Sequence, residues 1–274
     1  MNGLVKLTAV GLLVVSQTVL AQDWFAPKLP FKNAVVEYQV TGMSAGTKTT
    51  YIRDYGRESA EYTNLSMKMM GMVQTQQEID ITTRDWVYSV DMNSRTATKM
   101  MNPEKVYRQE LEKYSSTEQD KIATNAEKFG MNSLQGMGGT LTKNAAKLQG
   151  YSCDLTEMSG IKVYSISETG FPLKVETNMM GMKSTEEAVS IKKVSPPADK
   201  FSLPAGVTVE HDQMAENMMR NHIRQTLSSL VAGEMPKLDS GGYDAQGAEM
   251  NSGEEALSPE AMQQLQQMMQ QFGQ

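Results

Sequence analysis

Residues 34–41, Ala-Val-Val-Glu-Tyr-Gln-Val-Thr, set a two-residue period that decides the fold class of this chain. In an extended strand, successive side chains point to opposite faces, so Ala34, Val36, Tyr38 and Val40 share one face. The opposite face is mostly polar. This alternation is typical of a β-strand that is buried on one side and in contact with solvent on the other.

The same period continues downstream. Residues 47–54 are rich in Thr and Tyr, which favour strands, and the isoleucines of 79–81 alternate with acidic residues. Residues 86–92 place two aromatic side chains, Trp86 and Tyr88, on one face together with Val90 and Met92. Short turn-forming segments separate these runs, as expected for hairpins.

Helical spacing interrupts the strands over residues 103–129. Pro103 is a favourable first residue of a helix, and apolar residues then recur at i, i+4 and i+7 in two successive stretches. We expect a Gly-rich connection over 130–139. Further strands are expected at 148–158, 162–167, 173–177 and 184–194. Prolines at 196, 197 and 204 are then expected to end the sheet, since proline cannot donate to a strand ladder. The order of elements predicts a mainly β (α+β) fold, with one antiparallel sheet curled around helices.

The two ends of the chain differ from this body. Residues 1–21 have a basic Lys6, an apolar run over 7–15 and small residues before Gln22, which predict a cleaved signal peptide and a periplasmic rather than secreted protein. No later segment is long and apolar enough for a transmembrane helix. The expected divisions are a signal peptide at 1–21, a sheet domain at 22–209, a helix at 210–232, a flexible linker at 233–257 and an amphipathic helix at 258–274.

Composition excludes several classes of function. The chain has 32 acidic and 26 basic residues, a net charge of −6, and therefore lacks the excess positive charge of a nucleic-acid-binding protein. One Cys excludes an internal disulfide and a Cys-cluster zinc site. No Gly-x-Ser-x-Gly or His-Glu-x-x-His motif is present. We expect a protein that is not an enzyme and needs no cofactor, with copper as the one metal to consider.

Methionine occurs 23 times, with clusters at 67–72 and 179–183 in strand-like contexts. In a regular strand Met67 and Met69 would share one face, with Met70 and Met72 on the other. A bulge at Met70–Gly71 would instead place Met67, Met69 and Met72 on one face. Three interpretations remain open. The methionines fill gaps in the core, form a plastic apolar cavity, or capture Cu(I) through their soft thioethers.

A sharper form of the copper hypothesis involves one helix. His211, Met214, Met218 and His222 lie at i, i+3, i+7 and i+11, which would place them on one helical stripe. The competing interpretation is that both methionines border the apolar face of the helix while both histidines are solvated.

Several short motifs, taken in order, resemble the LolA/LolB/RseB-like superfamily of periplasmic lipoprotein carriers, and in particular an uncharacterised LolA-like branch of unknown function. The most specific is Pro197-Ala198-Asp199-Lys200-Phe201-Ser202-Leu203-Pro204. The others lie at 51–56, 70–72, 85–91, 99–103, 150–153, 170–173 and 180–183.

The resemblance implies an incomplete antiparallel β-barrel with inserted helices over the open side, plus C-terminal helices. It also implies an apolar cavity that binds or carries a hydrophobic ligand such as a lipid, an acyl chain or a lipoprotein tail. The candidate wall residues are Met67, Met69, Met72, Trp86, Tyr88, Met180 and Met182. The richness in Met and the long C-terminus depart from the better-known relatives.

Two alternatives to a carrier remain. In the first, the chain is a protein-interaction module whose barrel is filled by its own side chains and whose helix at 258–272 docks a partner. In the second, it binds or buffers Cu(I).

Overall fold

The computed structural model describes residues 29–69, 72–136, 138–179 and 182–236. The expected signal peptide, linker and C-terminal amphipathic helix lie outside these residues. The elements are β1 (Ala34–Gly42), β2 (Ser44–Arg53), η1 (Asp54–Gly56), β3 (Glu58–Met69), β4 (Met72–Thr82), β5 (Trp86–Asp91), β6 (Thr96–Met101), α1 (Pro103–Leu111), α2 (Ser116–Gly136), β7 (Thr140–Leu148), β8 (Tyr151–Met158), β9 (Ile161–Ile166), β10 (Pro172–Met179), β11 (Met182–Lys192), η2 (Ala198–Phe201), β12 (Thr208–His211) and α3 (Gln213–Ala232).

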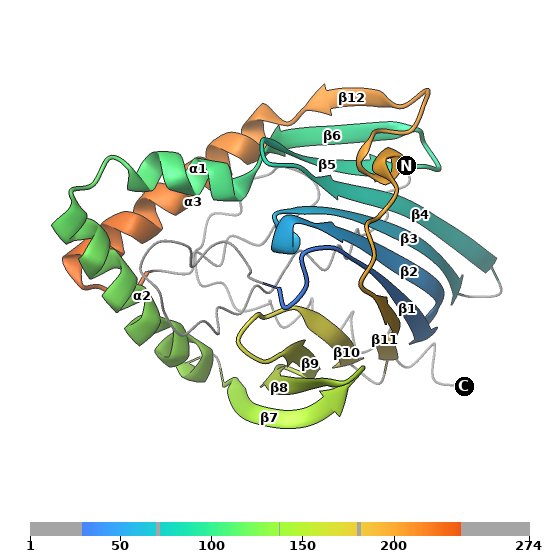
Figure 1. Cartoon of the computed structure of the whole chain (residues 1–274), viewed down its shortest axis with the longest axis horizontal. Coiled ribbons are helices and arrows are strands. Elements are labelled where there is room, and N and C mark those ends of the chain that lie inside the picture. The colour runs from blue at the N-terminus through green and yellow to red at the C-terminus, as the bar shows by residue number, and fades with distance from the viewer. Residues whose placement is uncertain (1–28, 70–71, 137, 180–181, 237–274) are drawn as a thin grey trace, which may run out of the picture. The chain divides into compact units, whose positions relative to one another are not determined.

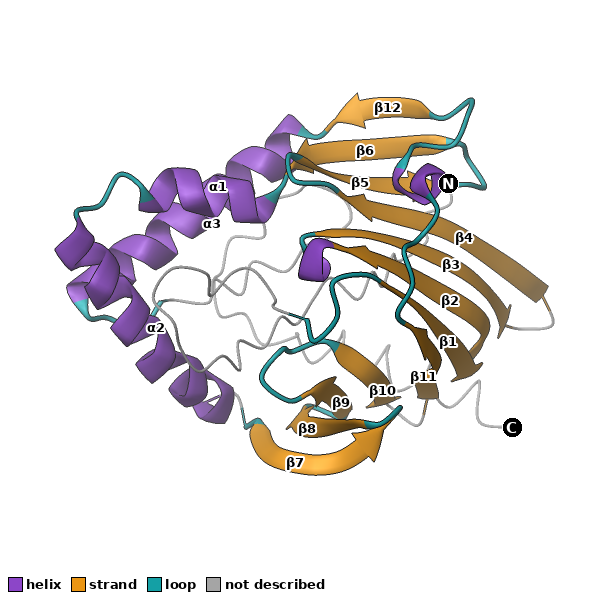
Figure 2. Ribbon diagram, in the orientation of Figure 1, coloured by secondary structure: helices purple, strands orange, loops and turns teal. Residues whose placement is uncertain are grey.

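The described strands form one sheet, which is the mainly β, unclosed architecture that the sequence predicts (Figures 1 and 2). The strand order is β12-β6-β5-β4-β3-β2-β1-β11-β10-β9-β8-β7. Strands β1–β6 and β7–β11 are two up-and-down halves, joined where β1 pairs with β11. The edges of the sheet are β12 and β7, which do not pair with each other, so the barrel is incomplete.

Two strands depart from the expectations. The prolines at 196, 197 and 204 do not end the sheet, because β12 follows them and pairs in parallel with β6.

The expected Gly-rich connection over 130–139 is also wrong in part. Helix α2 continues through Gly130 to Gly136, and β7 begins at Thr140. One glycine inside a helix costs only about 1 kcal/mol, which the flanking helical residues offset.

The sheet has a buried cluster on its outer face, over β3–β6. Ala60, Ile79, Ile81 and Val90 are buried there beneath the segment that links β11 to β12. Phe201 from this segment packs against the cluster, with the guanidinium of Arg53 3.9 Å from its ring centroid. The motif at 197–204 is therefore the cover of the outer face.

The helices form a cluster of their own. Val106 of α1, Ile122 of α2, and Ile223 and Leu227 of α3 are buried together. The insertion α1–α2 connects β6, beside one edge of the sheet, to β7 at the other edge, as Figure 2 shows. Helix α3 lies within the expected range 210–232. No helix of the described residues is both long and apolar enough to cross a bilayer.

Both methionine clusters lie at hairpin ends. Strand β3 ends at Met69, β4 begins at Met72, and these two residues pair. In the same way Met179 of β10 pairs with Met182 of β11. The expectation of one continuous strand with a bulge at Gly71 is therefore wrong, because the chain reverses direction there.

Candidate ligand-binding site

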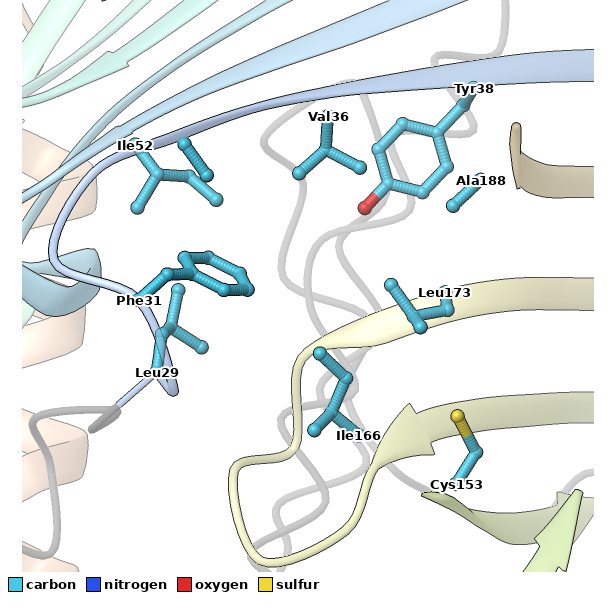
Figure 3. Packing of buried hydrophobic residues seen from close by; sticks show 10 residues of the cluster. Leu29, Phe31, Val36, Tyr38, Ile52, Cys153, Ile166, Leu173 and Ala188 are labelled. Carbon is cyan, nitrogen blue, oxygen red and sulfur yellow. The ribbon is translucent and has the colours of Figure 1, made fainter. Parts of the chain in front are cut away.

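The inner face of the curled sheet carries an apolar strip, shown in Figure 3. Val36, Tyr38 and Ile52 point from β1 and β2 toward Leu173 and Ile166 of the other half of the sheet. All are buried. The strip follows directly from the two-residue period of residues 34–40, which directs alternate apolar side chains inward.

Two side chains from a segment without regular secondary structure fill the space between the halves. Leu29 and Phe31 are each 4% exposed and lie between the facing strands (Figure 3). The ring of Phe31 meets Tyr151 and Phe171 edge-on, at centroid distances of 6.2 and 6.1 Å. We call Leu29 and Phe31 the plug.

Backbone hydrogen bonds hold the plug in place. The Leu29 N–H donates to the carbonyl oxygen of Tyr55 at 3.2 Å, and the Tyr55 N–H donates to that of Lys32 at 2.9 Å. Tyr55 has a left-handed backbone, with φ of 59°. A residue in this region is strained by roughly 1 kcal/mol or more, so the turn at Tyr55 persists because neighbouring contacts support it.

Beyond Tyr38 the inner face becomes charged. The ammonium of Lys48 lies 4.8 Å from the Tyr38 ring centroid and forms salt bridges with Glu61, at 3.4 Å, and with Glu186. The register places these side chains on one face of four neighbouring strands, β3, β2, β1 and β11. The Thr50 hydroxyl also donates to Glu61, at 3.2 Å. We call Lys48, Glu61, Glu186 and the adjacent Asp80 the charged row.

The protonation of the charged row follows from its environment. Burial lowers the pKa of Lys48, but Glu61 and Glu186 outweigh burial and raise that pKa above its ordinary value. Burial raises the pKa of Asp80, and the carboxylates of Glu61 and Glu78 raise it further, against a hydrogen bond from Ser89. Burial also raises the pKa of Tyr38 well above its ordinary value, so its hydroxyl stays protonated and donates to the Pro172 carbonyl oxygen at 2.9 Å.

The predicted wall residues do not share one face. Met67 of β3 is half-buried and has the inward register of Glu61. Trp86 and Tyr88 have the outward register: Tyr88 packs against the outer cluster, and Trp86 meets His211 edge-on at 5.6 Å. These two residues therefore cannot form one wall with Met67. The side chains of Met69, Met72 and Met182, and all of Met180, lie outside the described residues.

The proposed copper stripe is not one stripe. His211 belongs to β12, and the helix begins after it because the Asp212 side chain accepts a hydrogen bond from the Ala215 N–H. The Nε2 of His211 is 2.9 Å from Glu216. Met214, Met218 and His222 lie on the exposed surface of α3. The described residues contain no group of three or more His, Cys, Asp or Glu side chains able to hold a metal.

The charged row was not among the residues singled out from the sequence. A signal for it exists, since Asp80 alternates with Ile79 and Ile81 and so has to point to the face opposite theirs. The sequence does not show that this face is the inner one. As a whole, the inner face offers an apolar strip that ends at a row of hydrogen-bonding charges, an arrangement suited to an amphiphilic molecule.

No protein-family model and no curated protein sequence matches the chain. Solved structures similar to it include an uncharacterised conserved protein from Thermus thermophilus, with 9% identity, a TM-score of 0.39, and coverage of 68% of this chain and 94% of that one. MucB has 12% identity and a TM-score of 0.34, with coverage of 67% of this chain and 62% of MucB.

A complex of MucA and MucB from Pseudomonas aeruginosa has 12% identity and a TM-score of 0.32, with coverage of 63% and 56%. The chain thus spans less than two thirds of the MucB chains that it matches. At these identities and TM-scores the similarity says nothing about the function of this chain.

Proposed function

We propose that this chain is an exported, non-enzymatic binding protein of the periplasm that carries a hydrophobic group against the inner face of its sheet. The ligand would be a lipid, an acyl chain or a lipoprotein tail. One observation carries the proposal: the apolar strip accepts two apolar side chains, Leu29 and Phe31, between the two halves of the sheet (Figure 3). An acyl chain is likewise apolar, and its burial is worth about 25 cal/mol per Å² before ordering costs.

The charged row gives the proposed ligand a polarity along its length. Lys48 is a hydrogen-bond donor, while Glu61 and Asp80 are acceptors. A polar head with hydroxyl groups satisfies both kinds of partner, because a hydroxyl both donates and accepts, and the tail then lies along the strip. An amphiphile therefore fits this face better than a hydrocarbon without a head group.

The test is uptake of a fluorescent monoacylglycerol, whose head group carries hydroxyls, by the wild type and by a Leu29→Ala/Phe31→Ala variant. If ligand and plug compete for the strip, removing the plug should raise affinity about tenfold or more, because displacing a buried Phe or Leu costs roughly 1.5–3 kcal/mol. Phe201→Ala is the matched control, since it removes a ring from the outer face. Absence of uptake by both the wild type and the folded plug variant would contradict the proposal.

The second candidate is a protein-interaction module. The plug favours it, because an interior filled by the chain's own side chains is what this function requires. A chain ending at Pro236 separates the two candidates while keeping the bonds from the N–H groups of Gly233 and Glu234 that cap α3. If the shortened chain loses its cross-linked partner in a periplasmic extract and neither chain takes up the monoacylglycerol, the interaction module is favoured. Cu(I) binding stays a prediction. Unchanged Cu(I) affinity in a Met214→Ala/Met218→Ala variant would count against the copper ligands proposed on α3.

A further inference from the structure

Three turns lie side by side at one end of the sheet. Gly42 of β1 pairs with Ser184 of β11, and Ser44 of β2 pairs with Met67 of β3. The β1–β2 turn at Met43 therefore stands between the β10–β11 and β3–β4 hairpins, whose ends carry the two methionine clusters. The contact is close, since the Met43 N–H donates to the Lys183 carbonyl oxygen at 3.0 Å. A Cβ at position 42 would collide with that same oxygen.

This end of the sheet exposes apolar side chains. Met43 is 40% exposed and Val73, next to the β3–β4 turn, is 61% exposed. The backbone register places Met69 opposite Met72 and Met179 opposite Met182 at the same end. We call Met43, Val73 and the neighbouring Lys183 the hairpin end; residues 70–71 and 180–181 lie outside the described residues and are not part of it.

The charge of the hairpin end differs from that of the chain. Although acidic residues outnumber basic ones by 32 to 26, none occurs in 41–45, 66–75 or 177–184, the segments at and beside these three turns. The basic residues in the same segments are Lys68 and Lys183. Of these, Lys183 follows a methionine cluster directly and is exposed.

From this combination we propose that the hairpin end docks on an anionic lipid bilayer. Apolar side chains at and beside the turns enter the interfacial region, while the adjacent Lys183 meets anionic head groups, a contact worth about a fivefold gain in binding. The absence of acidic residues avoids repulsion from such a surface, and the acidic remainder of the chain orients the hairpin end toward it. This proposal does not depend on the proposed carriage of a hydrophobic ligand.

The first test is sedimentation of the full chain with vesicles of phosphatidylglycerol and phosphatidylcholine in equal parts. A Met43→Asp/Val73→Asp variant should lose at least tenfold in bound fraction, and Lys183→Ser about fivefold. Met214→Asp/Val194→Asp is the matched control, since it makes the same two changes at positions 71% and 52% exposed outside the hairpin end. Equal binding by the hairpin-end variant and the wild type would overturn the proposal.

A second test separates the hairpin end from any other membrane-binding segment. Cys153, the one cysteine of the chain, is buried, so a thiol-reactive fluorophore can be attached selectively to Met43→Cys or to Val194→Cys. The expected result is a blue shift on adding the anionic vesicles at position 43 and not at 194. No shift at 43, equal shifts at both positions, or an equal shift with phosphatidylcholine alone would overturn the proposal.

Discussion

Glu110 shows how a single side chain ties two helices together. It is 2% exposed, and its carboxylate accepts hydrogen bonds from Arg220 and Arg224 of α3, each at 2.9 Å, and from Lys113. Burial raises the pKa of Glu110, but these three cations outweigh it and lower the pKa to about 2. The ion cluster thus fixes α1 against α3 with a compensated charge.

Acid should weaken this link within a defined pH range. The ordinary Glu pKa of 4.5 applies when the chain is unfolded, and about 2 when it is folded. The stabilisation, of the order of 3 kcal/mol at most, is therefore complete above pH 4.5 and is lost as the pH falls toward 2. Urea unfolding across this range should show less pH dependence for Glu110→Gln than for the wild type. An unchanged slope in the variant would contradict the assignment.

Asp80 should behave in the opposite sense. Its pKa is raised in the folded protein, mainly by burial, so the wild type loses stability as the pH rises from the ordinary value of 3.8 through the folded value. Asp80→Asn should therefore stabilise the protein at neutral pH, by about 1 kcal/mol, and not in acid. Thermal unfolding at both pH values measures this difference. Ser89→Ala, which removes the hydrogen bond that favours the carboxylate, should destabilise the protein at neutral pH.

At the scale of elements, the start of α3 is attached to the sheet by one carboxylate. Oε2 of Glu216 accepts from the Met101 N–H at 3.0 Å and lies 2.9 Å from His211 of β12. Burial opposes ionisation, but these contacts prevail and lower the pKa of Glu216. The same side chain therefore anchors both α3 and the edge strand β12.

Glu216→Ala should cost about 1–3 kcal/mol of unfolding free energy, because it leaves the part-buried Met101 N–H without its partner and removes the contact with His211. Amide hydrogen exchange should rise first in β12 and the first turn of α3. Glu210→Ala is the control: it removes the same type of side chain from an exposed position in β12 and should change stability by less than about 0.5 kcal/mol. Equal effects of the two substitutions would show that Glu216 is not the anchor.

At the scale of the described domain, the plug joins the two halves of the sheet. Phe31 contacts Tyr151 and Phe171, and the buried cluster around it includes residues from β1, β2, β8, β9, β10 and β11. The halves are also connected by the β1–β11 pairing, by the helical insertion and by the segment that links β11 to β12.

Cys153 reports on this junction. Its side chain is buried in the same cluster, and burial raises the pKa of its thiol. Phe31→Ala should cost about 3–5 kcal/mol and speed alkylation of Cys153 under native conditions. Phe201→Ala, on the outer face, should leave the alkylation rate close to that of the wild type. A rate unaffected by Phe31→Ala would mean that the plug does not seal the strip.

Local sequence determined much of this protein. The two-residue period of 34–40, 79–81 and 86–92 defines strands with one buried face, and the 3.6-residue period of 103–129 defines helices, because each period follows from backbone geometry alone. Tertiary structure decided which face is inner. It placed Trp86 and Tyr88 outside and Glu61 and Asp80 inside, since both faces of this sheet carry apolar residues that different segments cover.

Tertiary structure also decided β7, β12 and the hairpin ends. Strand β7 changes register between Thr142 and Ala146, where Asp154 accepts the Asn144 N–H at 2.9 Å, so its period is broken. Strand β12 is exposed at every residue and exists through its parallel pairing with β6, a contact between distant parts of the chain. Neighbouring residues set the short periodic patterns. The edge strands, and the turns that meet across the sheet, depend instead on pairing between strands that are distant in the sequence, which no local pattern encodes.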